Sequence, residues 1–136
     1  EIGENCFLAD NAVVIGDVTG YVPNSDLPYL YNGAYIFLYT SLRESFGIPI
    51  LEAMACGTPV ITSNTSSMPE IAGEQAILVN PYKEENIMEK LLLLESDTHL
   101  YQQQVIYGLQ RIKTFSWENT AKKLLSIYSS LSKEQA

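Results

Sequence analysis

The stretch TSLRESFGIPILEAMACGTPVITS, residues 40–63, decides the fold. Pro49 and Gly57 bracket a helix, because proline is pre-set for the first turn and glycine adopts the left-handed conformation that follows the last. The enclosed segment PILEAMAC is apolar at nearly every position, so the helix should be buried on most sides. Glu52 lies in its middle, where an unpaired carboxylate costs roughly several kcal/mol. We therefore expect Glu52 to have a hydrogen-bonding or ionic partner.

The start of this helix lacks an obvious capping side chain. Gly47 and Ile48 precede Pro49 and carry no side-chain oxygen, which leaves Ser45 as the nearest candidate. An uncapped helix start that contains glycine binds anions, because its N–H groups point outward and the helix dipole favours negative charge. A phosphate suits this position.

Glu44 would repel a phosphate bound there, so we expect its carboxylate to turn aside, towards neutral hydroxyl groups. Seven residues separate it from Glu52. At a rise of about 1.5 Å per residue, Glu52 lies within roughly two turns of the anion site. One extended ligand can then contact both carboxylates and the helix start. A nucleotide sugar has the required form, with hydroxyl groups at both ends and phosphates between them.

These residues also carry a resemblance to a known family. Glu44 and Glu52 in ESFGIPILE match the E-x7-E motif of the retaining glycosyltransferases of family 4, which have the GT-B fold. From about Val18 onward the chain resembles the donor-binding half of such an enzyme, and FSWENTAKKLLSIY resembles its closing helix. The resemblance implies an α/β class: a Rossmann-like parallel sheet with flanking helices, forming a partial second domain of a GT-B glycosyltransferase.

The resemblance implies a role for each residue of the motif. Glu44 contacts hydroxyl groups of the transferred sugar and is the catalytic candidate, while Glu52 accepts hydrogen bonds from the ribose. Ser45 belongs to the same donor site, although the family more often has glycine there. The backbone N–H groups that meet the diphosphate or the sugar belong to Phe46, Gly47 and Ile48. The implied activity is transfer of a hexose from a nucleoside-diphosphate sugar to a glycan or lipid acceptor, with no metal ion and no separate cofactor.

The same resemblance implies that part of the enzyme lies outside this chain. The acceptor-binding N-terminal domain is absent, and so are the first strands of the donor domain, which in the family supply an Arg/Lys pair for the diphosphate. Arg43 is the only cation near the motif. We therefore expect this chain alone to be inactive.

Composition narrows the class further. The chain has 136 residues and is 46% hydrophobic, which predicts one globular core. A net charge of −8 argues against nucleic acid or an anionic membrane as partners of this domain, since both need a basic face. No apolar run approaches the ~20 residues that span a bilayer, and no signal peptide is recognisable. We expect a cytoplasmic protein that, in the full-length enzyme, can work at the inner face of the membrane.

Residues 1–19 differ from residues 20–136, the expected donor domain. The pairs IG, LA and VI recur there at six-residue spacing. This pattern resembles the β-helix of hexapeptide-repeat acyltransferases and γ-class carbonic anhydrases, but solenoids need several stacked repeats. We favour a strand, AVVIGDV, that enters the sheet. A foreign segment, joined at a junction or by gene rearrangement, is the alternative.

Around the motif the sequence predicts alternating helices and strands. A short helix in SDLPYLYNG, capped by Asn24 or Ser25, precedes the strand AYIFLYT, and the central helix is followed by the strand PVITS, a helical turn at Pro69 and the strand AILV. This order indicates a parallel βαβ unit, whose ligands bind at the carboxyl ends of the strands. Three amphipathic helices follow, in NIMEKLLLLE, THLYQQQVIYGLQRIKTF and SWENTAKKLLSIYSSL.

Several side chains near the motif have two interpretations. Ser66 and Ser67 either approach a ligand or cap a loop, and Glu70 is expected to complement a helix dipole outside the site. The tyrosines can be imagined as a sugar-stacking platform, but their spacing favours packing for Tyr29, Tyr31, Tyr35 and Tyr39.

Two other classes of function stay open at this point. One is a non-catalytic nucleotide-binding module, which would bind a nucleoside diphosphate without transfer in the full-length protein. The other is a β-helical acyltransferase or carbonic anhydrase-like protein, which only residues 1–19 suggest. A circular dichroism spectrum dominated by helix would exclude the latter.

Overall fold

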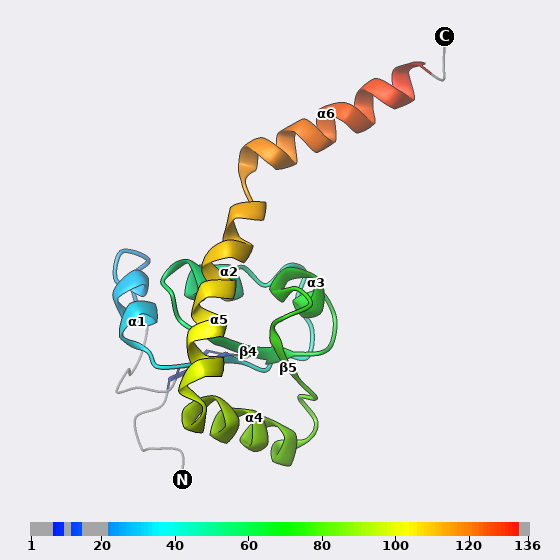
Figure 1. Cartoon of the computed structure of the whole chain (residues 1–136). Helices are drawn as coiled ribbons and strands as arrows, with labels where there is room; N and C mark the ends of the chain where they lie inside the picture. Colours follow the sequence, from blue (N-terminus) through cyan, green and yellow to red (C-terminus); the bar gives the residue numbers. More distant parts are fainter. Residues whose placement is uncertain (1–6, 10–11, 15–21, 134–136) are drawn as a thin grey trace.

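A computed structural model describes residues 7–9, 12–14 and 22–133 (Figure 1). Within these residues one sheet has five strands in the order β1-β2-β3-β4-β5. The strands are β1 (Phe7–Ala9), β2 (Ala12–Val14), β3 (Phe37–Tyr39), β4 (Val60–Ser63) and β5 (Ile77–Val79). The last three strands are parallel, with Phe37 opposite Val60 and Ile61 opposite Ile77. The expected α/β class with a parallel sheet is therefore confirmed for β3 to β5.

The edge of the sheet beside β3 departs from an all-parallel arrangement. β1 and β2 pair antiparallel, and β2 also pairs antiparallel with β3, where Val13 lies opposite Leu38. β2 is the described part of the strand AVVIGDV that the sequence favoured, and it does join the sheet. The six-residue repeat falls largely outside the described residues.

Helices follow the strands in the predicted order. They are α1 (Leu27–Gly33), α2 (Ile48–Ala55), α3 (Met68–Ala72), α4 (Glu84–Ser96), α5 (Thr98–Arg111), the 3-10 helix η1 (Ile112–Thr114) and α6 (Trp117–Lys133). The cap of α1 differs from the prediction: Asp26 is the N-cap residue in place of Asn24 or Ser25, and its side chain makes no capping hydrogen bond. In Figure 1, α2 and α3 lie on one side of the sheet and α4 on the other.

Both faces of the parallel strands are buried. Successive side chains of a strand point to opposite faces of the sheet, so neighbouring residues belong to different core clusters. Phe37 and Val60 pack with α1, α2 and α3 in one cluster. Leu38, Ile61 and Val79 pack with α4 and the start of α5 in the other. This explains why the strands read as unbroken apolar runs in the sequence.

The end of α2 matches the prediction from Gly57. This glycine has a left-handed φ of 75°. Its N–H donates to the carbonyl of Met54 at 3.1 Å, and the next N–H, of Thr58, donates to the carbonyl of Ala53 at 3.0 Å. These two bonds form a Schellman motif, which satisfies the last carbonyls of the helix and turns the chain towards β4.

Replacing Gly57 should therefore destabilise the protein through the backbone and not through crowding. An added Cβ would lie 3.9 Å from Val105 Cγ1, which is ordinary contact. We expect Gly57→Val to lower the free energy of unfolding by more than ~1 kcal/mol, measured by urea denaturation. Gly33→Val is the matched control, because Gly33 is not among the glycines with positive φ and a Cβ there meets nothing within 4 Å. An equal change in both variants would contradict the left-handed requirement at Gly57.

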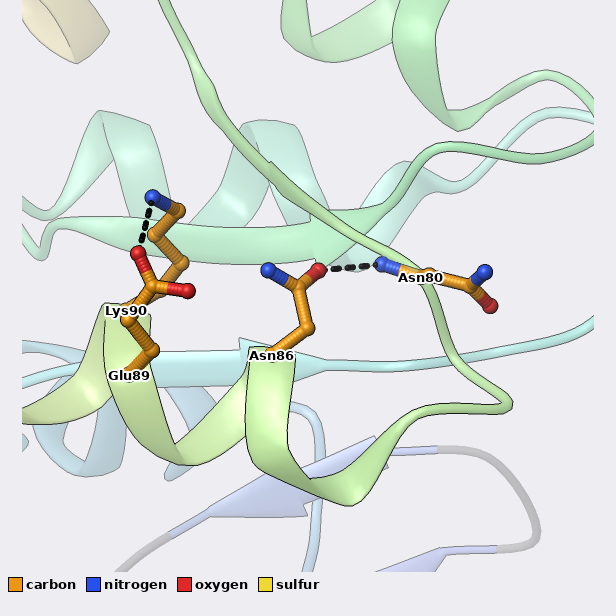
Figure 2. Close-up of polar contacts among 4 residues, drawn as sticks. All are labelled: Asn80, Asn86, Glu89 and Lys90. Atoms are coloured by element: carbon orange, nitrogen blue, oxygen red, sulfur yellow. Dashed lines mark hydrogen bonds and ion pairs between the residues drawn. The ribbon is translucent and has the colours of Figure 1, made fainter.

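The turn from β5 to α4 is fixed by asparagine side chains (Figure 2). The N–H of Asn80 donates to Oδ1 of Asn86 at 2.9 Å, and the N–H of Tyr82 donates to Oδ1 of Asn80 at 3.0 Å. Lys90 and Glu89 form an ion pair of 3.0 Å nearby, and such surface pairs contribute little stability. The asparagines thus orient the helix that covers the second face of the sheet.

The last two helices behave differently from each other. α5 packs closely against α2, since a Cβ added at Gly108 would lie 3.1 Å from Met54 Cγ. α6 extends away from the sheet (Figure 1), and each of its residues from Trp117 to Leu131 is exposed. Among the described helices, none has the length and apolar character needed to cross a membrane.

Removing α6 should leave the folded domain intact. We expect a chain that ends at Ser116 to keep its free energy of unfolding within about 0.5 kcal/mol, because no buried side chain is lost. A chain that ends at Arg111 is the contrasting variant, since it also loses Ile112 and Phe115, which pack against the core. Thermal denaturation followed by far-UV circular dichroism separates the two. A large loss on the first truncation would show that α6 supports the domain.

Candidate functional site

Two loops meet at the carboxyl ends of β3 and β4. Residues 40–47 lead from β3 into α2, and residues 64–67 lead from β4 into α3. Ser66 Oγ donates to the carbonyl of Glu44 at 2.8 Å, and Ser67 Oγ donates to the carbonyl of Phe46 at 3.0 Å. The loop that carries Glu44 is thus held by hydroxyl groups from the neighbouring loop. The loop-capping interpretation of Ser66 and Ser67 is confirmed.

The start of α2 is uncapped, as the sequence predicted. Gly47 is the N-cap residue, with a left-handed φ of 99° and no side-chain capping bond. Ser45 therefore does not cap the helix. Ile48, the first helical residue, is 56% exposed and Phe46 is 42% exposed. Glycine takes this φ without strain, and Gly47 itself is buried. The N–H of Ile50 donates to the carbonyl of Gly47 at 3.1 Å. Because Pro49 has no N–H, the first helical position, Ile48, is the one exposed residue of this turn that carries an N–H without a side-chain cap.

The carboxylate of Glu44 is turned towards neutral hydroxyl groups, as the sequence analysis predicted. Tyr39 donates its hydroxyl to Oε1 of Glu44 at 2.6 Å, and Ser41 Oγ donates to the same oxygen at 3.0 Å. Within the described part of the chain, Oε2 of Glu44 accepts no hydrogen bond. One carboxylate oxygen is therefore fixed, and the other has no protein donor among the described residues.

Glu52 has the partner that its position in α2 requires. The hydroxyl of Tyr31 donates to Oε2 of Glu52 at 3.0 Å, and among the described residues nothing donates to Oε1. The residues that the sequence singled out, Glu44 to Ile48 and Glu52, thus lie on one loop and the helix that it enters.

Sequence reasoning missed the two tyrosines that hold these carboxylates. Tyr31 and Tyr39 are buried at 7% and 5% exposure, so the packing interpretation is right for their rings and incomplete for their hydroxyls. It is wrong for Tyr29, which is 79% exposed, while Tyr35 stacks on Tyr101 at 4.5 Å. The available signal was chemical: a carboxylate in an apolar helix needs a donor, and tyrosines outnumber cations near the motif.

The hydroxyl groups that donate to the two carboxylates are neutral. Burial raises the pKa of the Tyr31 hydroxyl, and the charge of Glu52 raises it further. Burial and the hydrogen bond to Glu44 raise the pKa of Tyr39 in the same way. In the part of the chain that the structure describes, neither carboxylate forms an ion pair with a lysine or arginine. In that same part, no group of three His, Cys, Asp or Glu side chains is arranged to hold a metal ion.

The raised pKa values predict a loss of stability in alkali. Above pH about 10 the unfolded chain releases its tyrosine protons, while the folded protein retains those of Tyr31 and Tyr39. The free energy of unfolding should therefore fall as the pH rises above about 10. Urea denaturation between about pH 8 and about pH 11, a range that brackets the ordinary tyrosine pKa, measures this slope.

Tyr31→Phe and Tyr39→Phe should each flatten that alkaline slope, because each removes one retained proton. Tyr29→Phe, at an exposed position, is the matched control and should leave the slope unchanged. Equal slopes in all four proteins would show that folding does not raise the pKa of either buried hydroxyl.

A cleft of about 740 Å³ lies away from this loop, between α3 and α5. It is lined by residues that include Glu70, Glu74, Tyr107 and Arg111, and Glu44 and Glu52 do not line it. The guanidinium of Arg111 donates to the carbonyls of Ile71 and Glu70. Arg111 thus caps the end of α3, and the other charged side chains that line the cleft, Glu70 and Glu74, are acidic.

Sequence comparison assigns the family. The pattern of the family described as "Glycosyl transferases group 1" matches residues 10–111. The chain therefore belongs to the group 1 glycosyltransferases. It is 42% identical over 112 residues to the O-antigen chain mannosyltransferase B of Escherichia coli, a match that covers 82% of this chain and 29% of that enzyme. The match of the family begins inside residues 1–19, and the domain boundary at residue 20 stays a prediction.

Solved structures show the same fold. The C-terminal domain of LpcC, a glycosyl transferase group 1 family protein from Francisella tularensis, is 30% identical with a TM-score of 0.64, over 71% of this chain and 51% of that chain. HepE from Anabaena is 22% identical with a TM-score of 0.69, over 77% of this chain and 30% of that chain. The structural neighbours are GT-B glycosyltransferases, and this chain spans about a third of the length of such a relative.

Proposed function

We propose that this chain is the donor-binding part of a retaining hexosyltransferase of family 4. The observation that supports this most directly is the arrangement of Glu44 and Glu52 around an uncapped helix start. Each carboxylate has one oxygen held by a tyrosine hydroxyl and one oxygen without a protein donor among the described residues. Carboxylate oxygens accept hydrogen bonds from sugar hydroxyls, and the helix start accepts a phosphate between them.

In this proposal each residue of the motif contacts one part of a nucleoside-diphosphate sugar. Glu52 accepts hydrogen bonds from the ribose, and Glu44 contacts hydroxyl groups of the transferred hexose as the catalytic residue. Ser45 lies beside the sugar, where its side chain narrows the approach of the backbone. The N–H groups that meet the diphosphate or the sugar are those of Phe46, Gly47 and Ile48. Fixed dipoles of this kind stabilise the negative charge that develops on the leaving group, with no metal ion required.

The relatives are consistent with this donor class. The Escherichia coli relative is a mannosyltransferase by name, and HepE from Anabaena has been solved in complex with UDP and glucose. We infer that a glycan or lipid acceptor binds through an N-terminal domain that is not part of this chain. We also infer that the full-length enzyme acts in the cytoplasm and can work at the inner face of the membrane.

This chain alone should bind the donor and not transfer the sugar. Without an acceptor-binding domain the attacking hydroxyl is not held in place, and positioning of this kind accounts for ~7–11 kcal/mol of a barrier. A non-catalytic nucleotide-binding module would give the same binding result. Sugar transfer by the full-length protein, and its absence in that module, separates the two.

We expect weak binding of a nucleoside diphosphate that depends on Glu52. Ligand-observed NMR with UDP, GDP and ADP should give a dissociation constant near ~1 mM, about −4 kcal/mol, for the preferred base. Glu52→Ala should abolish the signal, because the ribose loses its acceptor. Glu89→Ala, which removes an exposed carboxylate on α4, is the control and should bind normally.

Either of two results would count against the proposal. Binding that persists unchanged in Glu52→Ala removes this residue from the site. Sugar transfer by the chain alone contradicts the requirement for an acceptor domain.

A further inference from the structure

Three packed aromatic rings connect the two carboxylates. The ring of Tyr31 meets Phe37 edge to face, with centroids 5.2 Å apart, and Phe37 stacks on Tyr39 at 5.8 Å. Phe37 is only 1% exposed, at the centre of the core cluster on the α2 face. The two hydroxyl groups that hold Glu52 and Glu44 therefore belong to one packed unit.

The main chain of both tyrosines is also anchored by β4 and the turn before it. Thr58 donates its hydroxyl to the carbonyl of Tyr31, and Thr62 donates its hydroxyl to the carbonyl of Tyr39 at 2.8 Å. Both threonines are buried, at 3% and 0% exposure. Since ring and backbone are fixed, each tyrosine hydroxyl has one position, and the carboxylate oxygen bonded to it is held there.

Tyrosine is suited to this task in a way that a cation is not. A phenol donates one hydrogen bond, whereas an arginine can occupy both oxygens of a carboxylate. Arg43, the nearest cation in sequence, is exposed and forms no ion pair with the carboxylates in the described part of the chain. The second oxygen of each carboxylate keeps its lone pairs for hydroxyl groups of a ligand.

We propose that Tyr31 and Tyr39 are positioning residues that each serve one end of the donor. Tyr31 fixes the position of the Glu52 carboxylate, which accepts hydrogen bonds from the ribose. Tyr39 fixes the position of the Glu44 carboxylate, which accepts hydrogen bonds from the transferred sugar. Phe37 joins them, so the spacing between the two ends is fixed by the core. This inference rests on the proposed function, because it assumes that the two carboxylates bind the two ends of a nucleotide sugar.

The test compares a nucleoside diphosphate with its sugar conjugate on Tyr→Phe variants of the whole chain. UDP and UDP-glucose, and GDP and GDP-mannose, are titrated by ligand-observed NMR. We expect Tyr31→Phe to weaken both members of the preferred pair equally, by about fivefold for one lost hydrogen bond. Tyr39→Phe should leave the nucleoside diphosphate unchanged and weaken only the sugar conjugate, by a similar factor.

Controls separate positioning from general stability. Tyr→Phe keeps the ring and its stacking, and Tyr29→Phe removes an exposed hydroxyl that should affect neither ligand. The melting temperature of each variant is measured alongside. A purely structural role would lower the melting temperature and weaken both ligands together in both variants.

The outcomes distinguish this inference from the function on which it rests. If the unchanged chain binds nucleotides and both variants affect the two ligands alike, or affect neither, the inference is overturned and the proposed function stands. If the unchanged chain binds no nucleotide, both are overturned. Equal weakening of both ligands by Tyr31→Phe, together with weakening of the sugar conjugate alone by Tyr39→Phe, supports the inference.

Discussion

The parallel pairing of β3 with β4 constrains the rest of this domain. Parallel strands cannot be joined by a tight turn, so the chain leaves β3 at Tyr39, crosses one face of the sheet as α2 and returns at Val60. Because that face is covered, α2 is apolar on nearly all sides and the loop that enters it lies at the carboxyl edge of the strands. The positions of Glu44 and Glu52 follow from this one connection.

Much of the fold could be predicted, because the apolar runs and the glycine after the central helix indicate the same elements that the packed core requires. The apolar runs became β3, β4 and β5, and Gly57 ended α2 in the left-handed conformation that its place after an apolar helix indicated. The antiparallel hairpin of β1 and β2 could not be predicted, since strands of three residues show no periodicity and their partner is decided at the sheet edge. The cap of α1 at Asp26 shifted because no side-chain bond fixes it.

The sequence could predict that Glu44 and Glu52 need hydrogen-bond donors, but it could not predict which residues supply them. The cost of a bare carboxylate in an apolar helix indicated that Glu52 needs a donor, and the helix start indicated that Glu44 turns towards hydroxyls. The donors themselves depend on tertiary structure, since Tyr31 lies 21 residues from Glu52. Which tyrosines face inward is decided by how α1 and β3 pack, and sequence spacing alone does not carry that information.

The exposed first turn of α6 has a spectroscopic consequence. Trp117 is the only tryptophan of the chain and is 88% exposed. Its emission reports the solvent around α6, so it should stay nearly constant while the core around Phe37 melts. Any molecule that covers the last helix should instead shift that emission to shorter wavelength. The chain thus carries an optical reporter for α6 that is insensitive to the domain from which the helix extends.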